Sequence, residues 1–176
     1  MTSGATLDLR DRVRDVPDFP KPGIVFKDLM PLVADATYFH ETIDRLEQLA
    51  RPLEPDIILG AEARGFIFGG ALADRLRCGF VPARKPGKLP WATVEATYDL
   101  EYGTDSLQVH RDAVTEGARV IVLDDVLATG GTARAKVELV EELGGVVAGV
   151  LFVIELGFLQ GRARLSGYDV HSLIQY

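Results

Sequence analysis

Short runs of consecutive apolar residues recur along the chain, and segments with helical periodicity separate them. The runs include "IIL" at 57–59, "VIVL" at 120–123 and "VVAGVLFVIEL" at 146–156. None of them alternates apolar and polar residues, as a strand with one face in water does. Buried strands that alternate with helices are typical of an α/β fold with a mostly parallel central sheet and helices on both faces. The pattern therefore predicts that fold class.

Periodicity and turn residues predict the positions of the individual elements. Helical spacing appears at 7–14, 38–49, 65–77 and 132–143, with a short helix at 159–165. Extended segments are expected at 23–32, where Pro31 would end the strand, and at 56–61, 79–85, 119–123, 146–156 and 169–176.

Length, charge and cysteine content limit the possible functions. The 176 residues suit a single domain, and 47% hydrophobic with 26% charged residues is ordinary for a globular protein. A net charge of -7 argues against a nucleic-acid partner, because phosphate backbones are bound by clustered Lys and Arg. The single cysteine, Cys78, excludes an internal disulfide and a multi-cysteine metal site. Neither a signal sequence nor a membrane span is recognisable, so we expect a cytoplasmic protein without membrane contact.

One connection is unusually long and polar. Residues 85–108 are rich in Pro and Gly at the start, and "TVEATYDLEYG" and "SLQVH" then have the composition of two short strands. A long connection inside a compact domain is a functional lid or a misassigned segment. We expect a flexible β-hairpin lid over about 85–108.

Two adjacent carboxylates end the central apolar run. Asp124 and Asp125 are followed by "VLATGGT", in which small residues and two glycines lead into the helix expected at 132–143. Ligands of open parallel sheets bind at the carboxyl ends of strands, and backbone N–H groups at a helix N-terminus bind anions. The spacing is not that of a Walker A loop, and no G-x-G-x-x-G is present.

A sugar phosphate reconciles the acidic pair with the anion-binding loop. The loop would hold the phosphate, while the aspartates accept hydrogen bonds from vicinal hydroxyl groups of the same ligand. The alternative is that Asp and Gly serve only helix capping and tight turning, as at many strand–turn–helix junctions.

"VIVLDDVLATGGT" resembles the phosphoribosyl pyrophosphate (PRPP) signature of type I phosphoribosyltransferases, in the form that marks the adenine-specific branch. Four other segments resemble parts of that family in the same order: "DFPKPGIVFKDLMPL" the purine-binding segment, "GAEARGFIFGGALA" the pyrophosphate loop, the stretch from "ARKPGKLP" to "HRDAV" the catalytic loop, and "VIELGFLQGRARL" the C-terminal segment. The resemblance implies purine salvage, in which adenine and PRPP give AMP and pyrophosphate. It also implies one phosphoribosyltransferase domain over 1–176, with an N-terminal purine-binding hood over about 1–34.

The resemblance assigns a role to each site residue. The 5-phosphate would bind Ala128, Thr129, Gly130, Gly131 and Thr132, and the ribose hydroxyls Asp124 and Asp125. Pyrophosphate would bind Arg64, Arg84, Lys85, Lys88 and Tyr102, the last of which would help to close the lid. Adenine would contact Val25, Phe26, Lys27 and Val126, although many members have Arg in place of this Lys and Leu in place of this Val. Glu101 would be the catalytic residue that handles the proton on the purine. Taken singly, such residues are more often solvated surface or ordinary core.

Mg²⁺ is the expected cofactor, held mainly by PRPP oxygens and water rather than by a protein cage. A homodimer is expected, with Arg84 or Lys85 reaching toward the neighbouring subunit's site, and the family's non-proline cis peptide falls on Glu62–Ala63. A hypoxanthine–guanine enzyme is the alternative within the fold, but it would need a later Lys to bind a 6-oxo group, and Lys136 lies inside the expected helix. A PRPP-sensing regulator is the alternative outside enzymes, but an acidic chain of this length has no room for a basic DNA-binding domain.

Overall fold

The computed structural model of the chain describes residues 7–99 and 103–176. Contacts divide the chain into two compact units, residues 1–45 and 46–176. The boundary falls inside helix α2 (Ala36–Ala50), which begins in the smaller unit and ends in the larger one. No helix of the described residues is both long and apolar enough to cross a membrane.

The smaller unit contains a two-stranded antiparallel sheet. The 3₁₀ turn η1 (Leu9–Arg12) leads into β1 (Arg14–Pro17), which pairs with β2 (Val25–Asp28), and helix α1 (Met30–Ala34) follows. Two expectations were wrong here. The expected helix at 7–14 is only one 3₁₀ turn, because the chain is recruited into the β1–β2 ladder from Arg14 on. The expected strand to residue 32 ends at Asp28, because Pro31 opens a helix instead of ending a strand.

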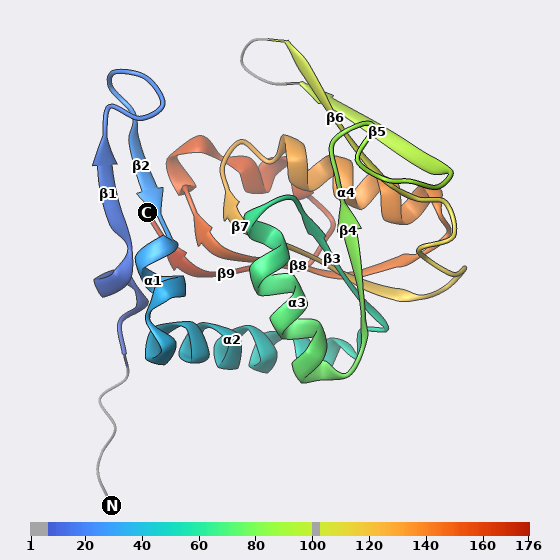
Figure 1. The fold of residues 1–176 in the computed structure, drawn as a ribbon, viewed down its shortest axis with the longest axis horizontal. Coiled ribbons are helices and arrows are strands. Elements are labelled where there is room, and N and C mark those ends of the chain that lie inside the picture. The colour runs from blue at the N-terminus through green and yellow to red at the C-terminus, as the bar shows by residue number, and fades with distance from the viewer. Residues whose placement is uncertain (1–6, 100–102) are drawn as a thin grey trace, which may run out of the picture. The chain divides into compact units, whose positions relative to one another are not determined.

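The larger unit is built on a five-stranded parallel sheet in the order β4-β3-β7-β8-β9 (Figure 1). Its strands are β3 (Ile57–Ala61), β4 (Gly79–Ala83), β7 (Arg119–Leu127), β8 (Val146–Glu155) and β9 (Val170–Gln175). Its helices are α3 (Arg64–Leu76) and α4 (Gly131–Glu142), with 3₁₀ turns η2 (Arg51–Leu53), η3 (Gly157–Leu159) and η4 (Gly161–Leu165). The α/β class predicted from the apolar runs is confirmed.

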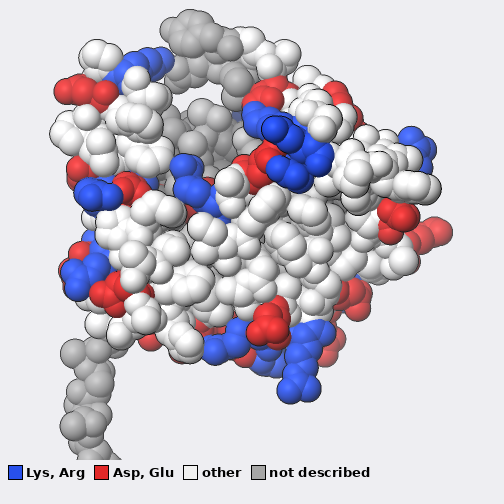
Figure 2. All heavy atoms as spheres, in the orientation of Figure 1, with Lys and Arg blue, Asp and Glu red and all other residues white. Residues whose placement is uncertain are grey.

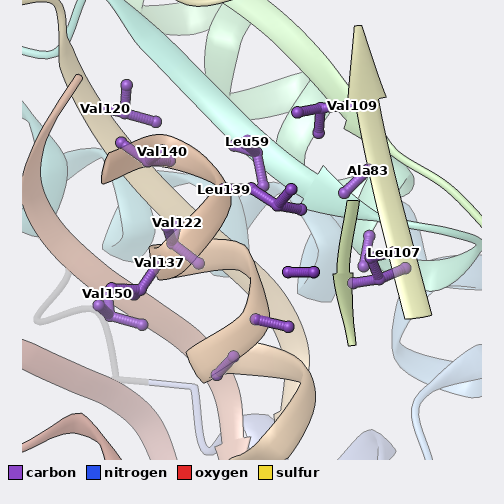
Figure 3. Packing of buried hydrophobic residues seen from close by; sticks show 14 of the residues in the cluster. Leu59, Ala83, Leu107, Val109, Val120, Val122, Val137, Leu139, Val140 and Val150 are labelled. Carbon is purple, nitrogen blue, oxygen red and sulfur yellow. The ribbon is translucent and has the colours of Figure 1, made fainter. Parts of the chain in front are cut away.

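The two helices cover opposite faces of this sheet. Alternate strand residues, such as Leu59 and Val122, join Val137 and Val140 of α4 in one buried cluster (Figure 3). The intervening residues of the strands belong to the other face, and α3 packs on β3 and β7 from that side. Burial on both faces explains why the strands are continuous apolar runs.

The long polar connection forms a hairpin. Strands β5 (Thr93–Asp99) and β6 (Thr104–His110) pair antiparallel from Thr93↔His110 to Asp99↔Thr104. The inward-facing side chains of the hairpin, including Leu107 and Val109, are buried in the same cluster as α4 (Figure 3). Backbone hydrogen bonds between Arg84 and Gln108 also join β6 to the end of β4. The expected pairing of the two segments is therefore present, and the base of the hairpin is part of the core.

Candidate active site

The strand order places a topological switch between β3 and β7. From β3 the chain moves outward to β4, whereas from β7 it moves the other way, to β8 and β9. The loops that follow two such strands diverge and leave a crevice at their carboxyl ends, where ligands of open α/β sheets bind. Glu62 to Arg64, which follow β3, and Asp124 to Gly131, which form the carboxyl end of β7 and the loop after it, therefore lie at this edge.

The loop after β7 forms an anion cradle. Its Gly130 has φ +84°, a left-handed conformation that glycine adopts without strain, and it caps the N-terminus of α4. The first N–H groups of a helix lack intrahelical partners, so they are free to bind a negative group. A pocket at this point is lined by Asp124, residues 126–133 and Phe152. The structure thus gathers around one pocket all five residues expected to bind the 5-phosphate, with Asp124 and Val126 beside them.

The two aspartates are buried, and each has a basic partner. Asp124 Oδ2 lies 2.6 Å from Nζ of Lys136, and its Oδ1 accepts the Asp125 N–H at 3.0 Å. Asp125 is paired with Arg64 at the N-terminus of α3. Burial and the neighbouring Asp124 charge raise the pKa of Asp125 to about 6, although Arg64 opposes the shift. Asp125 therefore takes up a proton near pH 6.

Three of the other expected pyrophosphate residues follow β4, and two of them, Arg84 and Lys85, are paired with carboxylates. Arg84 contacts Oε2 of Glu62 through both Nε (3.1 Å) and Nη2 (3.0 Å), and Lys85 is paired with Asp105 of the hairpin. Lys88 lies in the same turn, where its carbonyl accepts a hydrogen bond from Arg84 at 3.3 Å. Similarly, basic and acidic side chains mostly lie next to each other on the face seen in Figure 2, rather than in patches of one sign.

The C-terminal segment packs against the loop after β7. A Cβ atom on Gly161 would lie 2.1 Å from the Ala128 carbonyl oxygen, and one on Gly130 would lie 2.4 Å from the Gly161 oxygen. Arg162 anchors this segment through two hydrogen bonds to Glu155, at 3.0 and 2.6 Å. These hydrogen bonds hold the pKa of the Glu155 carboxyl below its usual range, against the effect of burial. Two glycines in contact thus set the shape of the loop.

The remaining expected site residues lie in the smaller unit or outside the described residues. Val25, Phe26 and Lys27 belong to β2 in the smaller unit, where Phe26 packs edge-to-face on Phe19 and Lys27 pairs with Asp15 at 2.7 Å. Glu101 and Tyr102 lie outside the described residues. The Glu62–Ala63 peptide bond is cis, as the family resemblance implied.

Three residues at the site were missed by the sequence interpretation: Glu62, Lys136 and Gly161. For Lys136 a signal was available, because Ala133, Lys136, Val137 and Val140 follow the spacing of one helix face. A lysine on the apolar face of an amphipathic helix predicts a buried partner of opposite charge. No local pattern distinguishes Gly161, whose contact with Gly130 spans thirty-one positions of sequence.

Comparisons with known proteins agree with this geometry. A sequence model of the phosphoribosyl transferase domain matches residues 40–170. The adenine phosphoribosyltransferase of Rubrobacter xylanophilus is 59% identical over 96% of this chain and 91% of its own length. The crystal structure of adenine phosphoribosyltransferase from Thermoanaerobacter pseudethanolicus superposes with a TM-score of 0.95 at 52% identity, covering 98% of this chain and 100% of that one.

A yeast adenine phosphoribosyltransferase, from Saccharomyces cerevisiae, is similar at 42% identity with a TM-score of 0.89, over 94% of this chain and 96% of that one. That structure is a complex with adenine and an imino-altritol bisphosphate. Sequence and fold therefore agree over nearly the full length of the relatives. The chain belongs to the phosphoribosyltransferase family, among the adenine phosphoribosyltransferases.

Proposed function

We propose that the protein transfers the 5-phosphoribosyl group of PRPP to adenine, giving AMP and pyrophosphate, a step of purine salvage. The observation that carries the proposal is the buried pair Asp124–Asp125 directly ahead of a loop that opens α4 at the switch point of the sheet. The adenine phosphoribosyltransferases similar to this chain, one of them in complex with adenine, support the same substrate.

Different groups of the site bind the phosphate and the ribose of PRPP. Backbone N–H groups of residues 128–132 bind the 5-phosphate at the positive end of α4. Asp124 and Asp125 accept hydrogen bonds from the two ribose hydroxyls, and these bonds are strengthened by the carboxylate charge. N–H donors beside carboxylate acceptors thus suit a ligand that carries a phosphate next to a neutral, hydroxylated sugar.

Binding of the pyrophosphate group exchanges one set of ion pairs for another. Arg64, Arg84 and Lys85 are each paired with a carboxylate of the chain, and each is between one third and one half exposed. The pairs keep the cations oriented near the crevice, and a more highly charged ligand competes for them. Lys88 and Tyr102 complete the pyrophosphate site in this proposal.

Mg²⁺ is proposed as the cofactor. The described residues contain no group of three or more His, Cys, Asp and Glu side chains that could cage a metal ion. Mg²⁺ keeps several waters and binds substrate phosphate oxygens, so PRPP itself would carry the ion. When bound, the ion supplies positive charge to the departing pyrophosphate.

Catalysis then requires stabilisation of the charge that develops as pyrophosphate leaves the anomeric carbon, and transfer of the proton of the purine. The developing positive charge on the ribosyl ring is favoured by the nearby Asp124 and Asp125 carboxylates. Glu101 is proposed to handle the proton of the incoming purine. Glu101→Ala should therefore lower kcat while PRPP affinity stays close to that of the wild type, as measured by steady-state kinetics and calorimetry. Full retention of kcat would remove Glu101 from the mechanism.

Adenine is proposed to bind Val25, Phe26 and Lys27 of the N-terminal hood, with Val126 as an apolar contact from the phosphate-site side. Phe26 would stack on the purine, and backbone groups beside it would bind the amino edge. In the same proposal the 85–108 hairpin closes as a lid and excludes water from the reacting centre. Limited proteolysis checks the lid: cleavage within 85–108 should be suppressed by PRPP with Mg²⁺, and equal cleavage with and without ligand would contradict closure.

A cytoplasmic homodimer completes the proposal, with Arg84 or Lys85 of one subunit reaching toward the other site. Activity should then fall when the protein is diluted below its dimer dissociation constant. A monomer with full activity, identified by light scattering, would contradict the shared site.

The substrate is tested with a panel of adenine, hypoxanthine, guanine and orotate, each supplied with PRPP and Mg²⁺, by following pyrophosphate release. Adenine should be strongly preferred, because groups that bind the amino edge are left unpaired against a 6-oxo base. Comparable turnover of hypoxanthine would overturn the adenine assignment.

A further inference from the structure

A lysine lies inside the protein directly behind the ribose-binding carboxylates. Lys136 of α4 is fully buried, with 0% of its side chain exposed. Its Nζ lies 2.6 Å from Asp124 Oδ2 and 3.2 Å from the Leu123 carbonyl oxygen. A buried lysine is costly unless it is paired, so the surrounding fold must maintain this contact. The position of Lys136 excludes direct contact with a ligand in the crevice.

The Asp124 carboxylate is held from three sides. Lys136 binds one oxygen, and the other accepts the Asp125 N–H at 3.0 Å. On the side of α3, a Cβ atom on Gly65 would lie only 2.8 Å from Asp124 Oδ1, so the helix backbone closes off that direction. The orientation of the carboxylate is therefore set by the protein before any ligand arrives.

Lys136 and Arg64 differ in whether they stay paired with the aspartates when the ligand binds. Within the described part of the chain, two cations contact the aspartate pair: Lys136 from α4 touches Asp124, and Arg64 from α3 touches Asp125. The Arg64 side chain is 46% exposed and is proposed to bind pyrophosphate. When Arg64 turns to that ligand, Lys136 is the cation that still neutralises the buried pair.

We propose that Lys136 is a positioning residue for PRPP: it holds the Asp124 carboxylate in a fixed orientation, so that both carboxylates can accept hydrogen bonds from the ribose hydroxyls. The inference rests on the proposed function and adds to it a residue that never touches the substrate. A purely structural ion pair would behave differently, because its loss would change stability without changing PRPP binding or its pH dependence.

The test compares Lys136→Met with the wild type. Methionine keeps the length of the side chain and removes the charge. PRPP with Mg²⁺ is titrated by calorimetry between pH 5.5 and 8.5, and KM is measured for both substrates. The Kd for PRPP should rise about ten- to hundredfold, because a charge-assisted hydrogen bond behind the acceptor is lost. The loss should be largest at low pH, since a carboxylate pair without Lys136 retains a proton to higher pH. The KM for adenine should stay unchanged.

Val140→Ala is the matched control. Val140 is also fully buried in α4, and its truncation destabilises the same helix without changing the charge near Asp124. It should leave PRPP affinity and its pH dependence as in the wild type. A Lys136→Met protein with wild-type affinity and an unchanged pH profile overturns the inference.

A second measurement covers the case in which Lys136→Met does not fold. In the wild-type protein, the ¹⁵N signal of Lys136 Nζ should shift when PRPP with Mg²⁺ binds, because its partner Asp124 gains hydrogen bonds from the ribose. A signal that does not respond to saturating PRPP overturns the inference. Wild-type protein that fails to bind PRPP at all overturns the proposed function instead, which keeps the two failures apart.

Discussion

Two groups of ion pairs lie at the same edge of the sheet, and they differ mainly in burial. Asp124 and Asp125 are less than one tenth exposed, and one of their cations, Lys136, is fully buried. The pairs Arg84–Glu62 and Lys85–Asp105 lie beside them, but their cations are 34% and 45% exposed. Water screens the second group and hardly reaches Asp124, Asp125 and Lys136.

This difference predicts which charges can be changed at little cost. A buried ion that loses its partner has no solvent to replace it, whereas an exposed one is rehydrated. The buried group is therefore suited to a fixed acceptor geometry for the ribose. The exposed group is suited to exchanging its partners when pyrophosphate enters and leaves.

The largest effect is expected at Asp124. Asp124→Asn leaves the Lys136 charge buried without an anion and should lower the free energy of unfolding by about 3–5 kcal/mol. Asp105→Asn removes the anion of the exposed Lys85 pair and should cost no more than about 1 kcal/mol. Urea denaturation of the two isosteric variants measures the difference. Equal losses would show that burial does not separate the two groups.

The double variant Asp124→Asn/Lys136→Met makes this contrast sharper. Removing both charges should recover most of the stability lost in Asp124→Asn, because no unpaired buried charge remains. PRPP binding should stay weak, since the ribose acceptor is still altered. Recovery of binding together with stability would mean that Asp124 serves the fold alone.

Gly161→Ala tests whether the fixed geometry extends to the loop after β7, which is proposed to bind the 5-phosphate. The new methyl group would meet the Ala128 carbonyl oxygen at 2.1 Å, so the loop has to shift. Overpacking of this kind costs about 1–3 kcal/mol, and the Kd for ribose 5-phosphate should rise as well. Gly70→Ala in α3 is the control, because nothing lies within 4 Å of its added Cβ atom. A Gly161→Ala protein that binds like Gly70→Ala would contradict the support given by the C-terminal segment.

The affinity for PRPP should also fall at acidic pH because of the buried aspartate pair. The pKa of Asp125 is raised to about 6 by burial and the Asp124 charge, so the carboxyl takes up a proton as the pH falls through 6. PRPP affinity should then drop by up to about tenfold per pH unit below that value, if ionised Asp125 is the acceptor. Calorimetry in buffers from pH 5 to 8 measures this limit, which a flat profile would exclude.

The same pKa has the opposite effect on stability. The folded-state pKa lies above the unfolded value of about 3.9, so the contribution of this group is present at low pH and is lost as the pH rises through 6. Asp125→Asn should remove the pH dependence of PRPP affinity and that of the free energy of unfolding. The free energy of unfolding measured over the same pH range checks the sign.

The smallest effect is expected for Glu62→Gln. This change keeps an oxygen to accept the Lys85 N–H, which now lies 2.6 Å from Glu62 Oε1, and removes only the charge that pairs with Arg84. Arg84 is then more available to pyrophosphate, whose affinity should increase by no more than about fivefold. Direct titration with pyrophosphate and Mg²⁺ gives the value. A loss of affinity would mean that Glu62 orients Arg84 rather than competing for it.

Local sequence predicted much of the fold, and the reason is visible in particular elements. The run 119–123 and the "ATGGT" loop predicted a buried strand, an anion cradle and a helix, because these features depend on neighbouring residues. The hairpin was predicted from two strand-like segments on either side of a turn. By contrast, residues 7–14 have helical spacing and yet contribute only a 3₁₀ turn, because pairing of β1 with β2 overrides a weak local preference.

The sequence by itself determined the α/β class, the glycine-rich loop ahead of α4 and the acidic pair before it, since each is a contiguous pattern whose physics is local. Only the tertiary structure decided which distant residues meet: Lys136 and Asp124, Arg64 and Asp125, and Gly161 and Gly130. These contacts join segments that are between twelve and sixty-one positions apart. The packing of α3 and α4 on the sheet brings Arg64 and Lys136 to the two aspartates. A buried charge is stable only where the fold places an opposite charge beside it.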